Sequence, residues 1–199
     1  MGNIFNFSAS DTANWVQAFG CILAILGGFL FINYERKKIL NERNVERRKG
    51  VMNFCNLAKF IASSVSNNIN LLGAIHSQST TPPEVKFLGS VFALLPSLKY
   101  NFSVERKFTL QKQYQRGLNQ FIELNAPPTI LLSFTSLYEE LLVIEKYINE
   151  ISDIVNKQPP SLKAYTEVKR LLRKINHAKI MIDNYVIDIV SVLDKKNEP

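Results

Sequence analysis

Residues 130–155 read ILLSFTSLYEELLVIEKYINEISDIV, and the spacing of their large apolar residues decides the fold class. These residues recur alternately four and three positions apart, and they form what is called the first seam below: Ile130, Phe134, Leu137, Leu141, Ile144, Ile148, Ile151 and Val155. Such steps place side chains on one face of an α-helix, as in helix bundles and coiled coils. We therefore predict a long helix whose first seam faces other helices.

The last part of the chain carries a second seam with the same alternation of steps. Its members are Val168, Leu171, Ile175, Ala178, Ile182, Tyr185, Ile189 and Val192. Both helices have further apolar residues beside their seams, namely Leu142, Val143, Leu172, Met181, Val186 and Leu193. Because a stripe this wide can contact more than one neighbour, the pattern favours a bundle over a two-stranded coiled coil.

Three Pro-Pro pairs, at 82–83, 127–128 and 159–160, divide the rest of this region. Proline fits the first turn of a helix and interrupts whatever precedes it, so each pair predicts a helix start. At the first pair, Thr81 at the N-cap and Glu84 at N3 predict a capping box.

A helix over residues 44–76 is also predicted, with the inner face Val51, Cys55, Ala58, Ala62, Val65, Ile69 and Leu72. Shorter helices are expected over 84–95 and 103–124. No sustained period-2 alternation predicts a strand. The expected fold class is therefore all-α, with a bundle of four to five helices over residues 51–199.

Residues 12–34 read TANWVQAFGCILAILGGFLFINY and contain no charged side chain. As a helix this stretch is about 34 Å long at ~1.5 Å per residue, and a bilayer core of ~30 Å needs about 20 residues. We predict a single N-terminal transmembrane helix. A cleaved signal peptide and a buried core helix are the alternatives, but a signal peptide places its basic residues before the apolar run rather than after it.

Charge predicts the orientation of this helix. Residues 1–15 contain no Lys or Arg, whereas residues 35–49 contain Arg36, Lys37, Lys38, Arg43, Arg47, Arg48 and Lys49. Because Lys and Arg are retained on the cytoplasmic side, residues 1–11 should be a short extracytoplasmic N-terminus. Residues 35–50, the neck, should continue the helix and contact anionic headgroups. The chain is rich in Asn, Ile and Lys, which suggests a bacterial gene and hence the bacterial inner membrane, crossed once.

Small residues recur along one face of the predicted span. Gly20, Ala24 and Gly28 are each four positions apart, and small residues at this spacing let two helix backbones approach closely in lipid. The sequence therefore predicts a homo-oligomer assembled partly through this face. The alternative is that Gly and Ala are simply frequent in membrane helices.

The chain lacks the usual signatures of enzymes. It has no phosphate-binding loop, nucleophile elbow or His-Glu-x-x-His motif, and its two cysteines, Cys21 and Cys55, suffice for neither a disulfide framework nor a metal site. No cofactor or metal is predicted, and a non-enzymatic function is favoured.

One catalytic pattern remains, in which six residues separate Arg170 from His177. It resembles the Arg-x(4–6)-His motif of HEPN domains, which are all-helical and often ribonucleolytic. The resemblance implies that Arg170 and His177 of paired subunits act on a phosphodiester, with His177 as acid or base. The residue after the arginine is usually polar in that family and is Leu171 here. The alternative is that Arg170, Lys174 and His177 form a solvated basic helix face.

The whole arrangement resembles small bacterial phage-defence effectors with one N-terminal membrane helix and a HEPN-like cytoplasmic domain. Some CRISPR-associated accessory proteins are built in this way and assemble as membrane pores. The resemblance implies a membrane-anchored, oligomeric effector that perturbs membrane permeability. Two alternatives stay open. One is a passive tether or scaffold for a cytoplasmic protein partner, and the other is a membrane-bound ribonuclease, for which nucleic acid would be the partner.

Overall fold

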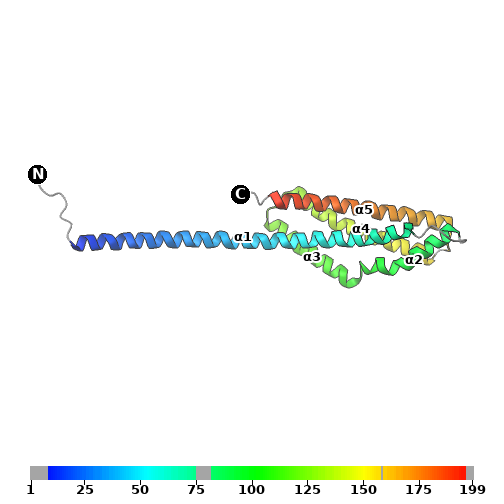
Figure 1. Ribbon diagram of the computed structural model, residues 1–199, viewed down its shortest axis with the longest axis horizontal. Coiled ribbons are helices and arrows are strands. Elements are labelled where there is room, and N and C mark those ends of the chain that lie inside the picture. The colour runs from blue at the N-terminus through cyan, green and yellow to red at the C-terminus, as the bar shows by residue number, and fades with distance from the viewer. Residues whose placement is uncertain (1–8, 75–81, 158, 196–199) are drawn as a thin grey trace. The chain divides into compact units, whose positions relative to one another are not determined.

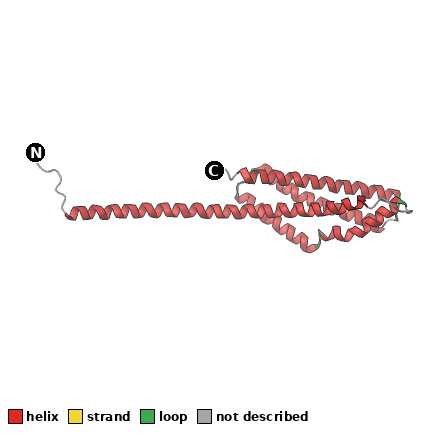
Figure 2. Ribbon diagram, viewed as in Figure 1, coloured by secondary structure: helices red, strands yellow, loops and turns green. Residues whose placement is uncertain are grey.

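The computed structural model describes residues 9–74, 82–157 and 159–195. Its regular elements are α1 (Ala9–Ala74), α2 (Pro83–Tyr100), α3 (Val104–Glu123), α4 (Pro128–Lys157) and α5 (Leu162–Lys195) (Figure 1). No strand occurs in the described part of the chain (Figure 2), so the all-α prediction is confirmed. The chain forms two compact units, Met1–Glu46 and Arg47–Pro199, and each is described by itself.

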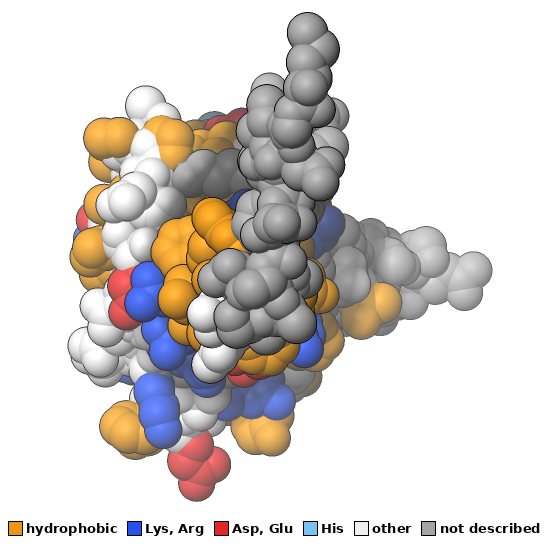
Figure 3. Space-filling view, turned by 90° about the vertical axis from the view of Figure 1, so that its left-hand side faces the viewer, with side chains coloured by type: hydrophobic (Ala, Val, Ile, Leu, Met, Phe, Trp, Pro, Cys, Tyr) orange, Lys and Arg blue, Asp and Glu red, His pale blue; other side chains and the backbone are white. Residues whose placement is uncertain are grey.

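The first unit contains the apolar part of α1. This helix is long and apolar enough to cross a membrane, by length and composition, and its apolar window has no buried residues. The large side chains of residues 15–32 are more than half exposed, as Val16, Leu23 and Ile25 illustrate. Exposed hydrophobic side chains also appear beside Lys and Arg side chains on the face shown in Figure 3. The predicted N-terminus, residues 1–11, lies mostly outside the described residues.

The neck is helical throughout, because α1 continues through residues 35–50 without a break at Gly50. The second unit begins at Arg47, four residues before the predicted boundary at 50/51. Arg47 explains this early start, since its Nε lies 2.8 Å from a carboxylate oxygen of Glu123 on α3. The last turn of the neck therefore belongs structurally to the second unit.

The second unit is a helical bundle, and the first seam lies in its core. Seven of the eight seam residues are buried, and Val155 alone is partly exposed. The second seam is confirmed from Val168 to Ile182. Beyond Ile182 the prediction is confirmed at Ile189, which is buried, and is wrong at Tyr185 and Val192, which are partly exposed while the next residues along, Val186 and Leu193, are buried. A straight α-helix drifts by about 20° per heptad against a strict seven-residue repeat, so the buried stripe widens toward positions 186 and 193.

The C-terminal part of α1 supplies a third side of the core. All seven residues of its predicted inner face are buried, together with Phe54. The ring centroids of Phe54 and Phe134 on α4 are 4.8 Å apart. The ring centroids of Phe134 and Phe121 on α3 are 4.9 Å apart. Rings at these separations contribute stabilisation beyond their buried area. The Ser66 hydroxyl donates a hydrogen bond of 3.1 Å to Asn176 on α5, so this part of α1 contacts both α4 and α5.

Two of the three Pro-Pro pairs start helices as predicted, whereas the third helix begins shortly after its pair. Helices α2 and α4 begin at the second proline of their pairs, whereas α5 begins at Leu162, two residues after Pro160. There Ser161 caps the helix, because its hydroxyl accepts a hydrogen bond of 3.2 Å from the Ala164 amide. The capping-box prediction is wrong: Pro82 is the N-cap of α2 and no side chain caps it. Thr81 lies outside the described residues.

Helix α2 also extends further than predicted. It ends at Tyr100 rather than Leu95, although Pro96 lies inside it. The apolar face continues past this proline through Leu98, which is fully buried. Burial of this side chain offsets the backbone hydrogen bond that a proline removes from a helix.

Gly117 on α3 provides a test of this packing. A Cβ at Gly117 would lie 2.6 Å from Cζ of Phe134, whose ring is held between Phe54 and Phe121. We expect Gly117→Ala to lower the free energy of unfolding by about 1–3 kcal/mol through overpacking, despite the gain of up to ~1 kcal/mol in helix propensity. Denaturant unfolding of the full-length protein in detergent measures the change.

The matched control is Gly89→Ala on α2, where a Cβ would meet no atom within 4 Å. This substitution should stabilise the bundle slightly, because only the propensity gain applies. Equal stabilisation by both alanines would contradict the close approach of α3 and α4 at Gly117.

Candidate functional site

A groove of about 600 Å³ runs along the junction of α4 and α5, and it is called the α4–α5 groove below. It is lined by Glu140, Val143 and Tyr147 from α4 and by Arg170, Arg173, Lys174, His177 and Ala178 from α5. Its volume lies within the range of about 300–1,000 Å³ typical of small-molecule sites. The groove therefore combines ligand-sized space with several charged side chains.

The sequence of α5 explains why the basic residues converge. Positions 170, 173, 174 and 177 lie within about two helical turns and on one face. The intervening seam residues Leu171 and Ile175 are buried against the bundle. Burial of the seam holds the basic face at the edge of the α4–α5 contact, so Arg170 and His177 share one groove, as their spacing predicts.

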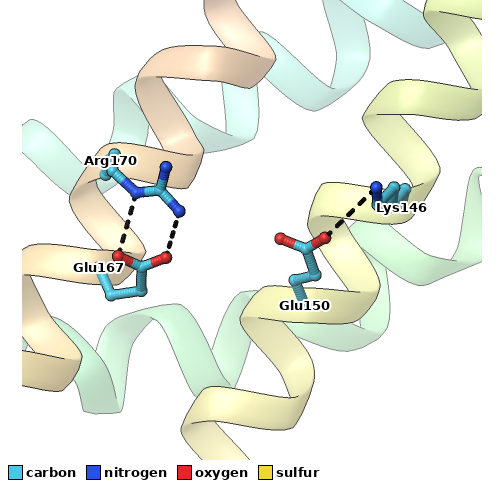
Figure 4. A network of polar contacts seen from close by, with 4 residues as sticks. All are labelled: Lys146, Glu150, Glu167 and Arg170. Atoms are coloured by element: carbon cyan, nitrogen blue, oxygen red, sulfur yellow. Dashed lines mark hydrogen bonds and ion pairs between the residues drawn. The ribbon is translucent and has the colours of Figure 1, made fainter.

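Arg170 is engaged within its own helix. Its Nε donates a hydrogen bond of 3.0 Å to one carboxylate oxygen of Glu167, and its Nη2 donates to the other (Figure 4). The hydrogen bonds from Arg170 lower the pKa of Glu167. Lys146 and Glu150 form an ion pair within α4, with 4.0 Å between Nζ and Oε1. Figure 4 shows each pair lying along its own helix.

The other cationic residues of the groove, unlike Arg170, are not held by a carboxylate in the part of the chain that the structure describes. Among the described residues, Arg173 and Lys174 have no ion pair with a carboxylate. The Nζ of Lys174 lies 5.2 Å from the centre of the Tyr147 ring, a weak attraction that leaves its charge available. Arg173, Lys174 and His177 are all exposed. These three side chains can therefore meet a ligand in the groove.

Within the described parts of the chain, Glu140 is the one acidic residue that lines the groove. Burial raises the pKa of its carboxyl group, and the nearby His177 opposes this shift. A raised pKa means that the surroundings disfavour the carboxylate charge. The groove lining includes three Lys or Arg side chains and this one carboxyl group among the described residues, so its balance of charge is positive.

Sequence reasoning found Arg170, Lys174 and His177 but missed Arg173 and Tyr147. Arg173 could have been found, because it lies three residues after Arg170 and so on the same helix face. Tyr147 comes from the other helix, and its place in the groove depends on how α4 and α5 pack. No motif in a single sequence carries that information.

The other predicted site residues lie on α1. A Cβ at Gly20 or Gly28 would meet no atom of the described chain within 4 Å, so the small face has space for a partner helix. Among the predicted headgroup contacts, Arg47 pairs with Glu123 in the bundle. Five of the remaining six, all but the partly exposed Arg48, are exposed. Contact with headgroups stays a prediction.

The cysteines do not suggest redox or metal chemistry. Cys55 is fully buried, and burial raises the pKa of its thiol to about 12, so it stays protonated and unreactive at neutral pH. No group of His, Cys, Asp or Glu within the described residues could hold a metal ion. His76 lies outside these residues.

Comparisons with known protein families, with curated proteins and with solved structures find no match to this chain.

Proposed function

We propose that the chain is a single-pass membrane protein that acts as an oligomeric, non-enzymatic effector and changes membrane permeability when its bundle responds to a signal. One observation carries the proposal: the apolar window of α1 has no buried residues in the folded chain. Exposure of so many contiguous apolar side chains to water is unfavourable. A bilayer would remove this cost for a helix of this length.

The charge on either side of the span supports an orientation. Seven Lys and Arg residues follow it in positions 35–49, and none precedes it in positions 1–15. The N-terminus would then be outside the bacterial inner membrane, and the bundle would lie in the cytoplasm. The basic neck would contact the anionic headgroups of the cytoplasmic leaflet.

Assembly is the step that links the span to permeability. The span contains no ionisable residue except Cys21 and, at its end, Tyr34, so it offers no chain of groups for relaying ions or protons. One apolar helix alone does not open a path for solutes, and several copies would have to assemble. The face of Gly20, Ala24 and Gly28 supports such assembly, because small residues allow close helix contacts.

The proposal is tested by expressing the full-length chain in bacteria and measuring uptake of a membrane-impermeant dye. We expect dye uptake to rise with expression, and a chain lacking residues 1–34 should cause none at the same level. The matched control is another single-pass protein expressed to the same amount in the membrane. Unchanged permeability with folded, membrane-located protein would contradict the effector proposal and favour the passive tether.

A ribonuclease is the second candidate, because Arg170 and His177 line one groove. For the effector, we expect the His177→Ala protein to stay folded and, like the wild type, to cleave no RNA, since an exposed side chain on α5 contributes little to folding. A ribonuclease that uses His177 as acid or base would instead lose about 10²–10⁴-fold in rate. Cleavage of single-stranded RNA by the purified wild-type and variant proteins distinguishes the two. Histidine-dependent cleavage would overturn the non-enzymatic proposal.

A further inference from the structure

We infer that the α4–α5 groove binds a multiply charged phosphate group through Arg173, Lys174 and His177. The inference rests on the proposed function in one respect, since this ligand would be the signal to which the bundle responds. It assigns no catalytic step, and it involves two residues, Arg173 and Lys174, outside the Arg170/His177 pattern.

Two cationic side chains in the groove are available to a ligand. Arg173 and Lys174 form no ion pair with a carboxylate in the described part of the chain, and both side chains are exposed at the groove. Arg presents a planar fork that matches phosphate oxygens, and Lys supplies a compact charge. His177, one turn further along α5, adds a ring N–H donor.

Positive charge is concentrated on the first half of α5. Residues 162–179 contain six Lys or Arg residues and one acidic residue, Glu167. Glu167 is already engaged by Arg170, and of the residues that the structure describes, Glu140 alone brings a carboxyl group to the groove. The net charge of +5 on these 18 residues compares with +7 for the whole chain. A polyanion is therefore the ligand class that the electrostatics favour.

The size of the groove also fits a compact ligand. The groove volume of about 600 Å³ suits a compact phosphorylated ligand better than an extended chain. Val143 and Ala178 add apolar lining between the charged groups. Because the lining comes from both α4 and α5, a bound ligand would contact both helices and stabilise their pairing.

Two sources can supply such a group, and their chemistry is shared. One is a soluble phosphorylated molecule, and the other is the headgroup of an anionic phospholipid. Both present phosphate oxygens to Arg173 and Lys174. The experiment below separates them by the medium that surrounds the protein.

The test uses full-length protein in a neutral detergent, titrated with inorganic tripolyphosphate at fixed ionic strength. Isothermal calorimetry should show saturable binding, and the thermal midpoint should rise with ligand concentration. The double variant Arg173→Gln with Lys174→Gln should weaken binding by at least about tenfold, because two charged hydrogen-bond donors are lost. Its midpoint without ligand should match that of the wild type, because both side chains are exposed.

The matched control removes the same charge elsewhere, with Lys59→Gln on α1 and Lys112→Gln on α3, both exposed. Binding should stay within about twofold of the wild type, since distant exposed charges are screened. Equal weakening by both double variants would overturn the inference, because binding would then follow net charge alone. Absence of saturable binding in both detergent and lipid would overturn it too.

The second arm places the protein in lipid nanodiscs, either neutral or containing an anionic phospholipid. A headgroup source predicts that anionic lipid competes with tripolyphosphate and that the competition depends on Arg173 and Lys174. A soluble source predicts equal tripolyphosphate affinity in both nanodiscs. Dye uptake without groove binding would remove this inference alone, and groove binding without any permeability change would remove the effector proposal alone.

Discussion

Replacing Leu141 by Asp should largely unfold the bundle. Leu141 lies in the middle of the first seam and has no exposed surface. Removing a buried leucine side chain costs about 2–5 kcal/mol, and burying an unpaired carboxylate adds a further penalty. Because domains of this size are stable by only about 5–15 kcal/mol, we expect loss of most of the folded population at moderate temperature. Circular dichroism of the full-length protein in detergent during heating measures this.

The neighbouring residue provides a matched control. Leu142 is 40% exposed, so Leu142→Asp places the same charge one position away, where water can solvate it. Its thermal midpoint should stay close to that of the wild type. Similar midpoints for the two aspartate variants would contradict the burial of the first seam.

Replacing Ala24 and Gly28 together by leucine should lower the oligomer order. The span stays apolar, so insertion should be unaffected. The new side chains would hold the backbones of two packed helices apart. We expect light scattering of the detergent-solubilised protein to report a smaller assembly, and dye uptake in cells to fall with it.

Larger side chains on another face of the span provide the control for the double leucine substitution. Ile22→Phe with Leu26→Phe adds volume at the same spacing on a different side of the helix, and it should leave the oligomer intact. An assembly that withstands the double leucine substitution would mean that the bundle, rather than the small face, holds the subunits together.

The helical architecture could be predicted from local patterns because each helix carries a repeating apolar face. The first seam could be predicted without knowing which helices pack against it, since a spacing of four and three already places Leu137 and Leu141 on one side. The exchange of Tyr185 for Val186 in the core was harder to predict, because a seven-residue repeat and a straight helix diverge slowly. Such drift appears only when the partner helices are in place.

Some features of the α4–α5 groove could likewise be predicted from the sequence, and others could not. Arg170 and His177 could be placed together from sequence, because seven residues make about two helical turns. The pairing of Arg170 with Glu167 depends on side-chain conformation, and the position of Tyr147 depends on tertiary packing. The prediction of a capping box at Thr81 was wrong because a capping box is inferred from local sequence alone. In the structure Pro82 is the N-cap of α2.

Cysteine labelling tests whether α1 crosses the membrane once and holds the bundle in the cytoplasm. Single cysteines at Ser8 or at the exposed residue Asn184 are introduced after Cys21 and Cys55 are replaced by alanine. Sealed spheroplasts, with expression too low to raise dye uptake, are then treated with an impermeant thiol reagent. With the N-terminus outside and the bundle inside, we expect labelling at position 8 in sealed spheroplasts and at position 184 only after permeabilisation. Labelling of position 184 in sealed spheroplasts, with position 8 protected, would contradict this topology.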